Sequence, residues 1–351
     1  MTSSQTQNSL LLTMPDDVMR RILGESDYVG VQTLRKTCHS LRNFIDETLP
    51  DPSILYIKIT VKSEVISLDL DFFRSDFLIG IAYHKRKSGV LVEKRRHRNY
   101  DAMCPQKLKF LENFDFMDLF FIDFEVLLKF LNSQKSEIQR FEFTLSGVDG
   151  SEFCVKIQES FRENQTLKSF SLTLRIHEAS EVMSFLPYFS AGTLRKIQIS
   201  NSKATDNELD LERIYELEQW KKAKILIVNF FTVRGPRKFL DFEKSVAKFA
   251  TITMEETKML IENFRTSHTS RDKSCQLNYT HMDESIHEAL GAHPLVDIDY
   301  LGRVRIRWFW KTVAPEKILL IELNQEYILF MIIGWESVPQ NAIVQEWFYE
   351  E

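Results

Sequence analysis

Residues 138–145 read Ile-Gln-Arg-Phe-Glu-Phe-Thr-Leu, with apolar side chains at the first, fourth, sixth and eighth positions. The same pattern, or a weaker copy of it, begins again at positions 167, 194, 220, 247, 272 and 301. These starts lie 25 to 29 residues apart. A pattern of this type at this period is typical of leucine-rich repeats, which place one strand and one helix in each repeat. The sequence therefore predicts a degenerate leucine-rich-repeat-like β/α solenoid over residues 135–335.

The segments between the copies carry apolar residues at helical spacing, which predicts helices at 151–163, 178–189, 237–249 and 254–264. Within a strand, alternate side chains point to opposite faces. Apolar positions such as Phe141, Ile199 and Ile225 are therefore expected in the core. The residues between them would form an extended surface of the kind with which solenoids bind partners.

Cations on that surface are candidate partner-binding residues. Lys224 precedes the fourth strand, and a basic row at the end of the array would suit an acidic partner: Arg303, Arg305 and Arg307. The alternative is that these are solvated strand residues beside Trp308 and Trp310.

The composition argues against an enzyme. The chain of 351 residues has only 11 glycines against 27 phenylalanines. It contains no glycine-rich dinucleotide or kinase loop, no Walker A sequence, no G-x-S-x-G and no H-E-x-x-H. The histidines between 268 and 293 lack the short spacing of a zinc site. No catalytic residue, metal site or cofactor is therefore expected.

Charge and targeting signals point to an intracellular protein. The net charge is −5, so direct nucleic-acid binding is not expected. A basic run at 85–87 and 94–98 is either a nuclear signal or phosphate-contacting patch, or a solvated hairpin end. The longest apolar run, 327–335, is too short to cross a membrane, and the four cysteines form no C-x-x-C. These features predict a cytoplasmic or nuclear location and no membrane partner.

Residues 10–50 predict two or three short helices with Pro15 at the first helical position and Gly24 as a cap. Such a small module cannot form a good core alone. Its remaining apolar surface must either bind a partner or pack against its own chain.

Residues 14–23 and 34–45 resemble an F-box, in the version found in a large nematode family. This resemblance implies docking onto a Skp-type adaptor and, through it, onto a cullin ligase core. Ser26 stands where that family usually has leucine, which is expected to weaken adaptor binding. The residues expected to contact the adaptor are Pro15, Val18, Ile22, Leu23, Leu34 and Cys38.

Residues 217–224 read Leu-Glu-Gln-Trp-Lys-Lys-Ala-Lys and resemble the signature of the FTH domain, which accompanies the F-box in that family. Trp220 occupies the first apolar position of a repeat. Its large ring is expected to pack in the core, with direct partner contact as the alternative.

Together these features predict an α/β (α+β) chain with five parts. We expect a flexible tail (1–9), a three-helix F-box (10–50), a β-rich connecting segment with a buried helix near 114–131 (51–134), the FTH domain (135–335) and a C-terminal tail (336–351). The resemblance implies a substrate-recognition subunit of an SCF-type E3 ubiquitin ligase with an unknown target protein. The alternative is a non-ligase scaffold, one form of which would bridge an RNA-binding protein.

Overall fold

The computed structural model divides the chain into two compact units. Unit 1 contains Met1–Phe170 with Tyr188–Thr193, and unit 2 contains Ser171–Pro187 with Leu194–Glu351. The expected tail at 1–9 lies outside the described residues. The structure describes residues 14–73, 77–98, 102–103, 107–147, 150–164, 166–203, 207–267, 273–299 and 302–346.

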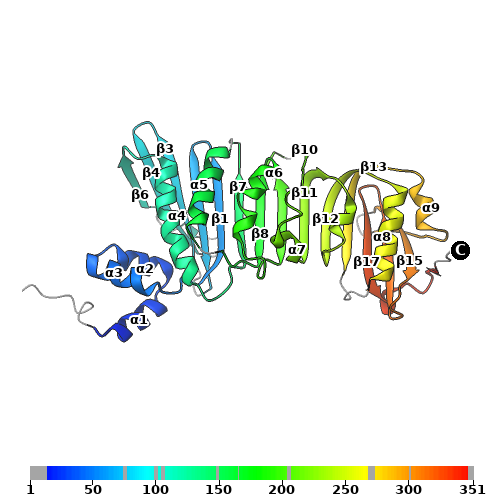
Figure 1. Cartoon of the computed structure of the whole chain (residues 1–351), viewed down its shortest axis with the longest axis horizontal. Coiled ribbons are helices and arrows are strands. Elements are labelled where there is room, and N and C mark those ends of the chain that lie inside the picture. The colour runs from blue at the N-terminus through cyan, green and yellow to red at the C-terminus, as the bar shows by residue number, and fades with distance from the viewer. Residues whose placement is uncertain are drawn as a thin grey trace, which may run out of the picture. The chain divides into compact units, whose positions relative to one another are not determined.

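Unit 1 begins with three helices, α1 (Asp16–Glu25), α2 (Tyr28–Arg35) and α3 (His39–Thr48) (Figure 1). Two acidic residues in the first turn of α1 suit the positive end of its dipole. The Asp27 side chain caps α2 by accepting a hydrogen bond from the Gly30 amide at 2.6 Å. Pro15 precedes α1 rather than opening it, and the helix runs one residue past Gly24.

An antiparallel meander follows the helices. Alternating apolar residues form β1 (Ile54–Lys62) and β2 (Val65–Phe72), and β3 (Phe77–Arg86) and β4 (Gly89–Arg98) complete the predicted hairpin. A Cβ atom on Gly89 would lie 2.1 Å from the Leu111 carbonyl oxygen, so only glycine fits this close strand approach. The remaining strands are β5 (Ala102–Met103), β6 (Lys107–Glu112) and β7 (Arg140–Leu145), which pairs in parallel with β1.

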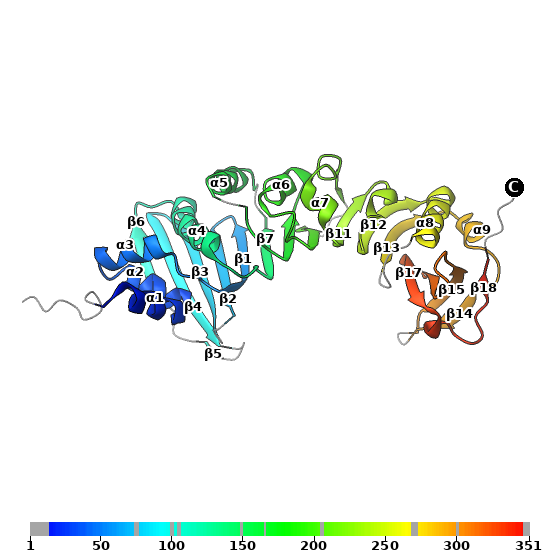
Figure 2. The same ribbon diagram turned by 60° about the horizontal axis from the view of Figure 1, so that its bottom comes forward.

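The core of unit 1 is built from phenylalanines. The expected buried helix is α4 (Phe116–Ser133), which Asp115 caps, and it lies beside α5 (Ser151–Arg162) on one face of the strands (Figure 2). Phe120 stacks on Phe124 at 5.5 Å between ring centroids and lies 5.9 Å from Phe153 of α5. This aromatic layer explains where many of the phenylalanines go.

Unit 2 contains a parallel array in chain order: β8 (Ser171–Ile176), β9 (Lys196–Asn201), β11 (Ile225–Val233), β12 (Lys244–Ile252) and β13 (Ser274–Met282). The short β10 (Asn207–Glu208) pairs with the end of β11. The helical segments between these strands lie on one face of the array (Figure 2). They are α6 (Ala179–Met183), η2 (Leu186–Tyr188), α7 (Glu218–Lys222), η3 (Pro236–Phe239) and α8 (Met254–Thr266).

The end of unit 2 departs from the predicted repeat. After α9 (Ile286–Leu290) the strands β13, β17 (Tyr327–Gly334), β16 (Lys317–Leu323), β15 (Val304–Lys311) and β14 (Leu295–Ile298) pair antiparallel in that spatial order. The last predicted copy is therefore β15, an antiparallel strand. The turn η4 (Trp335–Ser337) and the strand β18 (Val344–Gln345), which pairs with β15, lie in or beside the stretch predicted as a tail.

Two predictions inside the array are wrong. Residues 237–249 contain η3 and most of β12 instead of a helix, because Ser245, Ala247 and Phe249 are buried at the period of two that a strand requires. The buried residues of β11 are Leu226, Val228, Phe231 and Val233, so Ile225 faces away from the core. A register shift of one residue turns every side chain of a strand to the other face.

Candidate protein-docking surfaces

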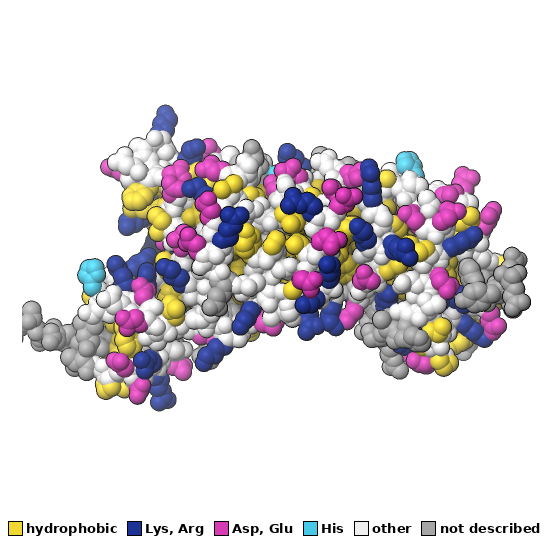
Figure 3. Space-filling view, viewed as in Figure 1, with side chains coloured by type: hydrophobic (Ala, Val, Ile, Leu, Met, Phe, Trp, Pro, Cys, Tyr) yellow, Lys and Arg dark blue, Asp and Glu magenta, His cyan; other side chains and the backbone are white. Residues whose placement is uncertain are grey.

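An apolar stripe lies exposed along α1. Met14 and Val18 are 37% and 44% exposed, and Ile22 is half-buried. Val18 and Ile22 are spaced by four, so they lie on one face of the helix, and the exposed Met14 and Pro15 directly precede its first turn. Hydrophobic side chains are visible at the surface around α1 (lower left in Figure 3). We call Met14, Pro15, Val18 and Ile22 the α1 stripe.

The adjacent face of α1 is used for internal packing. Met19 is 5% exposed and Leu23 is fully buried, where it meets Val31, Ile45 and Phe130 of α4. Leu34 is half-buried and packs against this same cluster. The three helices thus obtain a core by sharing it with α4.

A second surface is the face of the parallel array of unit 2 that lies opposite the buried strand residues. Strand pairing brings half-buried isoleucine and valine side chains together at its centre, between lysines and amides. We call this set the open face: Lys196, Gln198, Ile225, Ile227, Lys244, Val246, Lys248, Ser274, Gln276 and Asn278.

Comparison with known families identifies both parts. Residues 11–51 match the F-box domain, and residues 151–290 match the FTH domain. The chain is an F-box protein with an FTH domain. Both families act as adaptors rather than as enzymes. The resemblances inferred from the sequence are confirmed.

One curated relative of this F-box protein is F-box A protein 224 of Caenorhabditis elegans. The two are 23% identical over 264 residues, which cover 74% of this chain and 64% of the relative. The chain thus spans slightly less than two thirds of that protein's length. No solved structure matches the chain.

The structure revises the set of F-box residues expected to contact an adaptor. Pro15, Val18 and Ile22 belong to the α1 stripe, and Cys38 is half-buried where it precedes α3. Leu23 follows Ile22 by 100° around the helix and is fully buried, so it is not part of the exposed stripe. Met14, which is not among the predicted contact residues, is exposed just before Pro15 and adds to the stripe.

Ser26, the departure from the usual leucine, is satisfied within the F-box. Its hydroxyl donates a hydrogen bond to the Ile22 carbonyl at 2.7 Å, and its amide bonds to the Leu23 carbonyl at 3.2 Å. The serine therefore closes the last turn of α1 and places no unpaired polar group beside the stripe.

The predicted basic row is not a free cationic surface. Asp297 accepts two hydrogen bonds of 3.2 Å from Arg305 and is also paired with Arg307. Arg303 forms ion pairs of 3.2 Å with Asp299 and with Glu326. Each guanidinium group is thus already neutralised by carboxylates of neighbouring strands and loops.

Two further groups complete this polar cluster. Arg305 also lies 3.7 Å from Glu322, and the Tyr327 hydroxyl donates to the same carboxylate at 2.8 Å. Burial, together with the neighbouring Glu322, raises the pKa of Tyr327 to about 12. Lys224, the other predicted cation, is exposed and is paired with Glu243. The cluster therefore fixes the β14–β15 hairpin against β16 and β17.

Other kinds of site find little support in this F-box protein. Among the residues that the structure describes, no group of three or more metal-ligating side chains is close enough to hold an ion. No helix in the described ranges is long and apolar enough to cross a membrane. The side chains of Cys154 and Cys275 are buried, and burial raises the pKa of the Cys275 thiol to about 11.

Proposed function

We propose that this protein is the substrate-recognition subunit of an SCF-type E3 ubiquitin ligase in the cytoplasm or nucleus. The α1 stripe would bind a Skp-type adaptor and thereby the cullin core, and the open face would bind the target protein. The observation that carries the proposal is the exposed stripe on α1 of a matched F-box. It leaves large apolar side chains in water although the rest of the F-box is packed.

The mechanism would be proximity rather than chemistry. Holding a target beside the transfer machinery raises the effective concentration of its lysines. The chain itself would contribute only binding energy and orientation.

We further infer that β8, β9, β11, β12 and β13, with their connecting helical segments, form a degenerate leucine-rich-repeat-like solenoid. The parallel order, and a strand in each predicted copy from 167 to 279, support this interpretation. In such arrays the exposed strand face binds partners. The open face combines half-buried Ile225, Ile227 and Val246 with lysines, which suits an apolar target segment flanked by acidic residues.

Val18→Glu should lower the affinity for a Skp-type adaptor at least tenfold. Full burial of a valine side chain contributes about 1.5–3 kcal/mol, and a carboxylate at that position would also have to lose its hydration. Binding of the purified chain to the adaptor, measured by surface plasmon resonance, tests this.

The matched control is Arg20→Glu, which changes an exposed residue that follows Val18 by 200° around α1 and so lies away from the α1 stripe. It should retain nearly all of the affinity. Failure of the unsubstituted chain to bind any Skp-type adaptor would contradict the proposal and would favour the scaffold alternative.

Ile227→Asp should remove the co-purifying target while adaptor binding is retained. Ile227 lies at the centre of the open face between Gln198 and Val246, so a carboxylate there interrupts its apolar strip. Quantitative affinity purification with the proteasome inhibited would compare this variant with Met259→Asp, a half-buried apolar position on α8. If both variants recover the same proteins as the unsubstituted chain, the open face is not the target site.

A further inference from the structure

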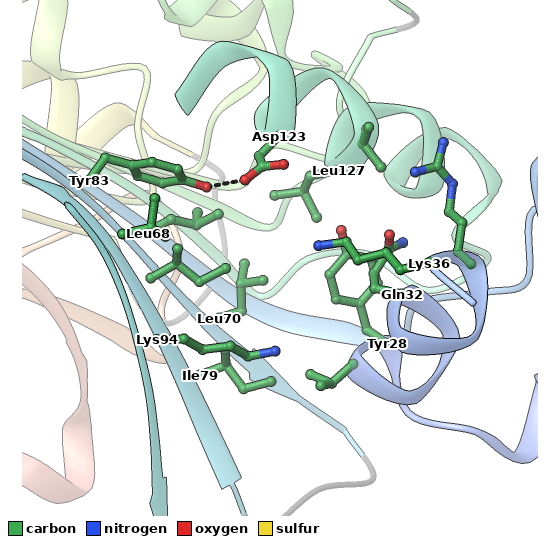
Figure 4. Close-up of a pocket in the computed structure, with 15 residues that line it drawn as sticks. Tyr28, Gln32, Lys36, Leu68, Leu70, Ile79, Tyr83, Lys94, Asp123 and Leu127 are labelled. Atoms are coloured by element: carbon green, nitrogen blue, oxygen red, sulfur yellow. Dashed lines mark hydrogen bonds between the residues drawn. The ribbon is translucent and has the colours of Figure 1, made fainter. Parts of the chain in front are cut away.

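A cavity of about 180 Å³ lies inside unit 1, at the junction of the F-box with the sheet. Three elements enclose it: helix α2, the face of strands β2 to β4, and helix α4 (Figure 4). Arg96 of β4 lies 3.7 Å from Asp27 at the start of α2, so the helix and the strand approach each other at its edge. The cavity is separate from both the α1 stripe and the open face.

The floor of the cavity is apolar. The sheet supplies the side chains of adjacent strands, which pair so that they share one face. Helix α4 closes the opposite side with Val126 and Leu127. The residues of the sheet floor are Leu68, Leu70, Ile79, Ile81 and Val92.

The polar groups of the cavity are mostly donors that lack partners. Lys94 of β4 is half-buried and forms no ion pair among the residues that the structure describes. The Gln32 side-chain nitrogen is fully buried and has no hydrogen-bond partner there. The carboxylate in the cavity lining, Asp123, already accepts a hydrogen bond from the Tyr83 hydroxyl at 2.6 Å (Figure 4). Asp27, at the edge of the cavity, also attracts Lys94 but is paired with Arg96. A buried donor without a partner is destabilising, so a ligand group that accepts a hydrogen bond from it would recover that free energy.

The other charged groups around the opening are also mainly positive. Arg35 is held by two hydrogen bonds to Asp46, at 2.5 and 2.9 Å, whereas Lys36 is exposed beside the opening. Burial, followed by repulsion from Lys36 and Lys107, lowers the pKa of Lys94. A negatively charged ligand group near the Lys94 ammonium group would therefore be attracted to this site.

We propose that this cavity binds a small amphipathic anion, a monocarboxylate with a compact apolar body of about six to eight carbons. The apolar body would lie on the floor formed by Leu70 and Ile79, and the carboxylate would accept from Lys94, whose ammonium group lies beside Ile79 (Figure 4). The size is appropriate, since an engineered apolar cavity of about 150 Å³ binds benzene. A neutral apolar molecule would leave Lys94 unpaired, and a cation would meet Lys94 and Lys36.

Occupancy would also affect the F-box. The ligand would contact α2 on one side and β4 on the other, so it would stabilise the docked position of α2. This gain in stability grows with ligand concentration, as expected for a ligand that binds the folded state and not the unfolded state. A metabolite could in this way influence how firmly the adaptor-binding module is held.

Isothermal titration calorimetry of the full chain with octanoate, 1-octanol and octylamine tests the proposal. Octanoate should bind tightest, 1-octanol at least tenfold more weakly, and octylamine should show no measurable binding. Lys94→Met should weaken octanoate about tenfold or more and leave 1-octanol unchanged, because it removes the charge and keeps the length. Lys129→Met, an exposed lysine of α4 outside the cavity, is the matched control and should bind like the unsubstituted chain.

Val92→Phe provides a steric test, because it fills the cavity from the sheet and should abolish binding of octanoate and 1-octanol together. If Val92→Phe does not fold, the octanoate affinity of Lys94→Met alone decides the test. Equal affinity for octanoate and octylamine, no heat with any of the three, or an unchanged octanoate affinity in Lys94→Met would overturn the proposal.

Discussion

Phe130→Ala should lower the free energy of unfolding of unit 1 by about 3–5 kcal/mol and release the F-box helices from α4. Phe130 is 1% exposed and belongs to the same cluster as Leu23, Val31 and Ile45. Its ring meets the ring of Tyr28 edge to face at 5.8 Å. Truncation would leave a cavity at the point where a module too small for its own core obtains one.

Hydrogen exchange followed by mass spectrometry measures this locally. Peptides from α1, α2 and α3 should lose exchange protection that corresponds to the whole loss in the free energy of unfolding. The protection of peptides from unit 2 should not change. Lys129→Ala, at the exposed neighbouring position of the same helix, should cost less than about 0.5 kcal/mol. Full protection of the F-box peptides in Phe130→Ala would show that the F-box folds independently of α4.

This contact with α4 could not be predicted from the sequence. The helical period of residues 14–45 was sufficient to predict the helices, and the limited length of the module indicated that its apolar surface needed a partner. Packing against the chain applies to one face of α1, where Leu23 lies in the cluster with Phe130, whereas Val18 on the other face remains exposed and its binding to a partner stays a prediction. A contact across more than 100 residues leaves no local pattern, and one residue of helical phase decides which side chain is buried.

For the open face and the polar cluster, the sequence likewise does not decide which side chains come together. Apolar residues at a period of two in the sequence predicted β7, β8 and β9, but in β11 the apolar run Ile225–Val228 is consistent with either phase. The sequence shows the row of arginines, yet only the antiparallel register of β14 on β15 places Asp297 opposite Arg305. The cavity beside Lys94 had no sequence signal, because its walls come from three separate segments.

Trp220→Ala should destabilise unit 2 by about 3–5 kcal/mol, which makes it the second large effect. Trp220 is 4% exposed on the short helix α7, within the block that resembles the FTH signature. Its ring packs edge to face against Tyr215 at 5.2 Å, Phe242 at 5.3 Å and Phe239 at 6.2 Å. One side chain thus joins α7 to the segments before and after it.

The choice between core packing and partner contact for Trp220 can be decided by comparing three variants. Trp220→Phe keeps an aromatic ring and should recover a large part of the lost stability, whereas Lys222→Ala changes an exposed residue of the same helix and should cost less than about 0.5 kcal/mol. Hydrogen-exchange protection of β11 and β12 should fall in Trp220→Ala, because the Trp220 ring packs against Phe239 and Phe242, which lie in the segment that joins these two strands. A variant that loses its partners while these strands stay fully protected would instead assign Trp220 to a binding surface. The burial of the ring among three aromatic neighbours makes the first result the expected one.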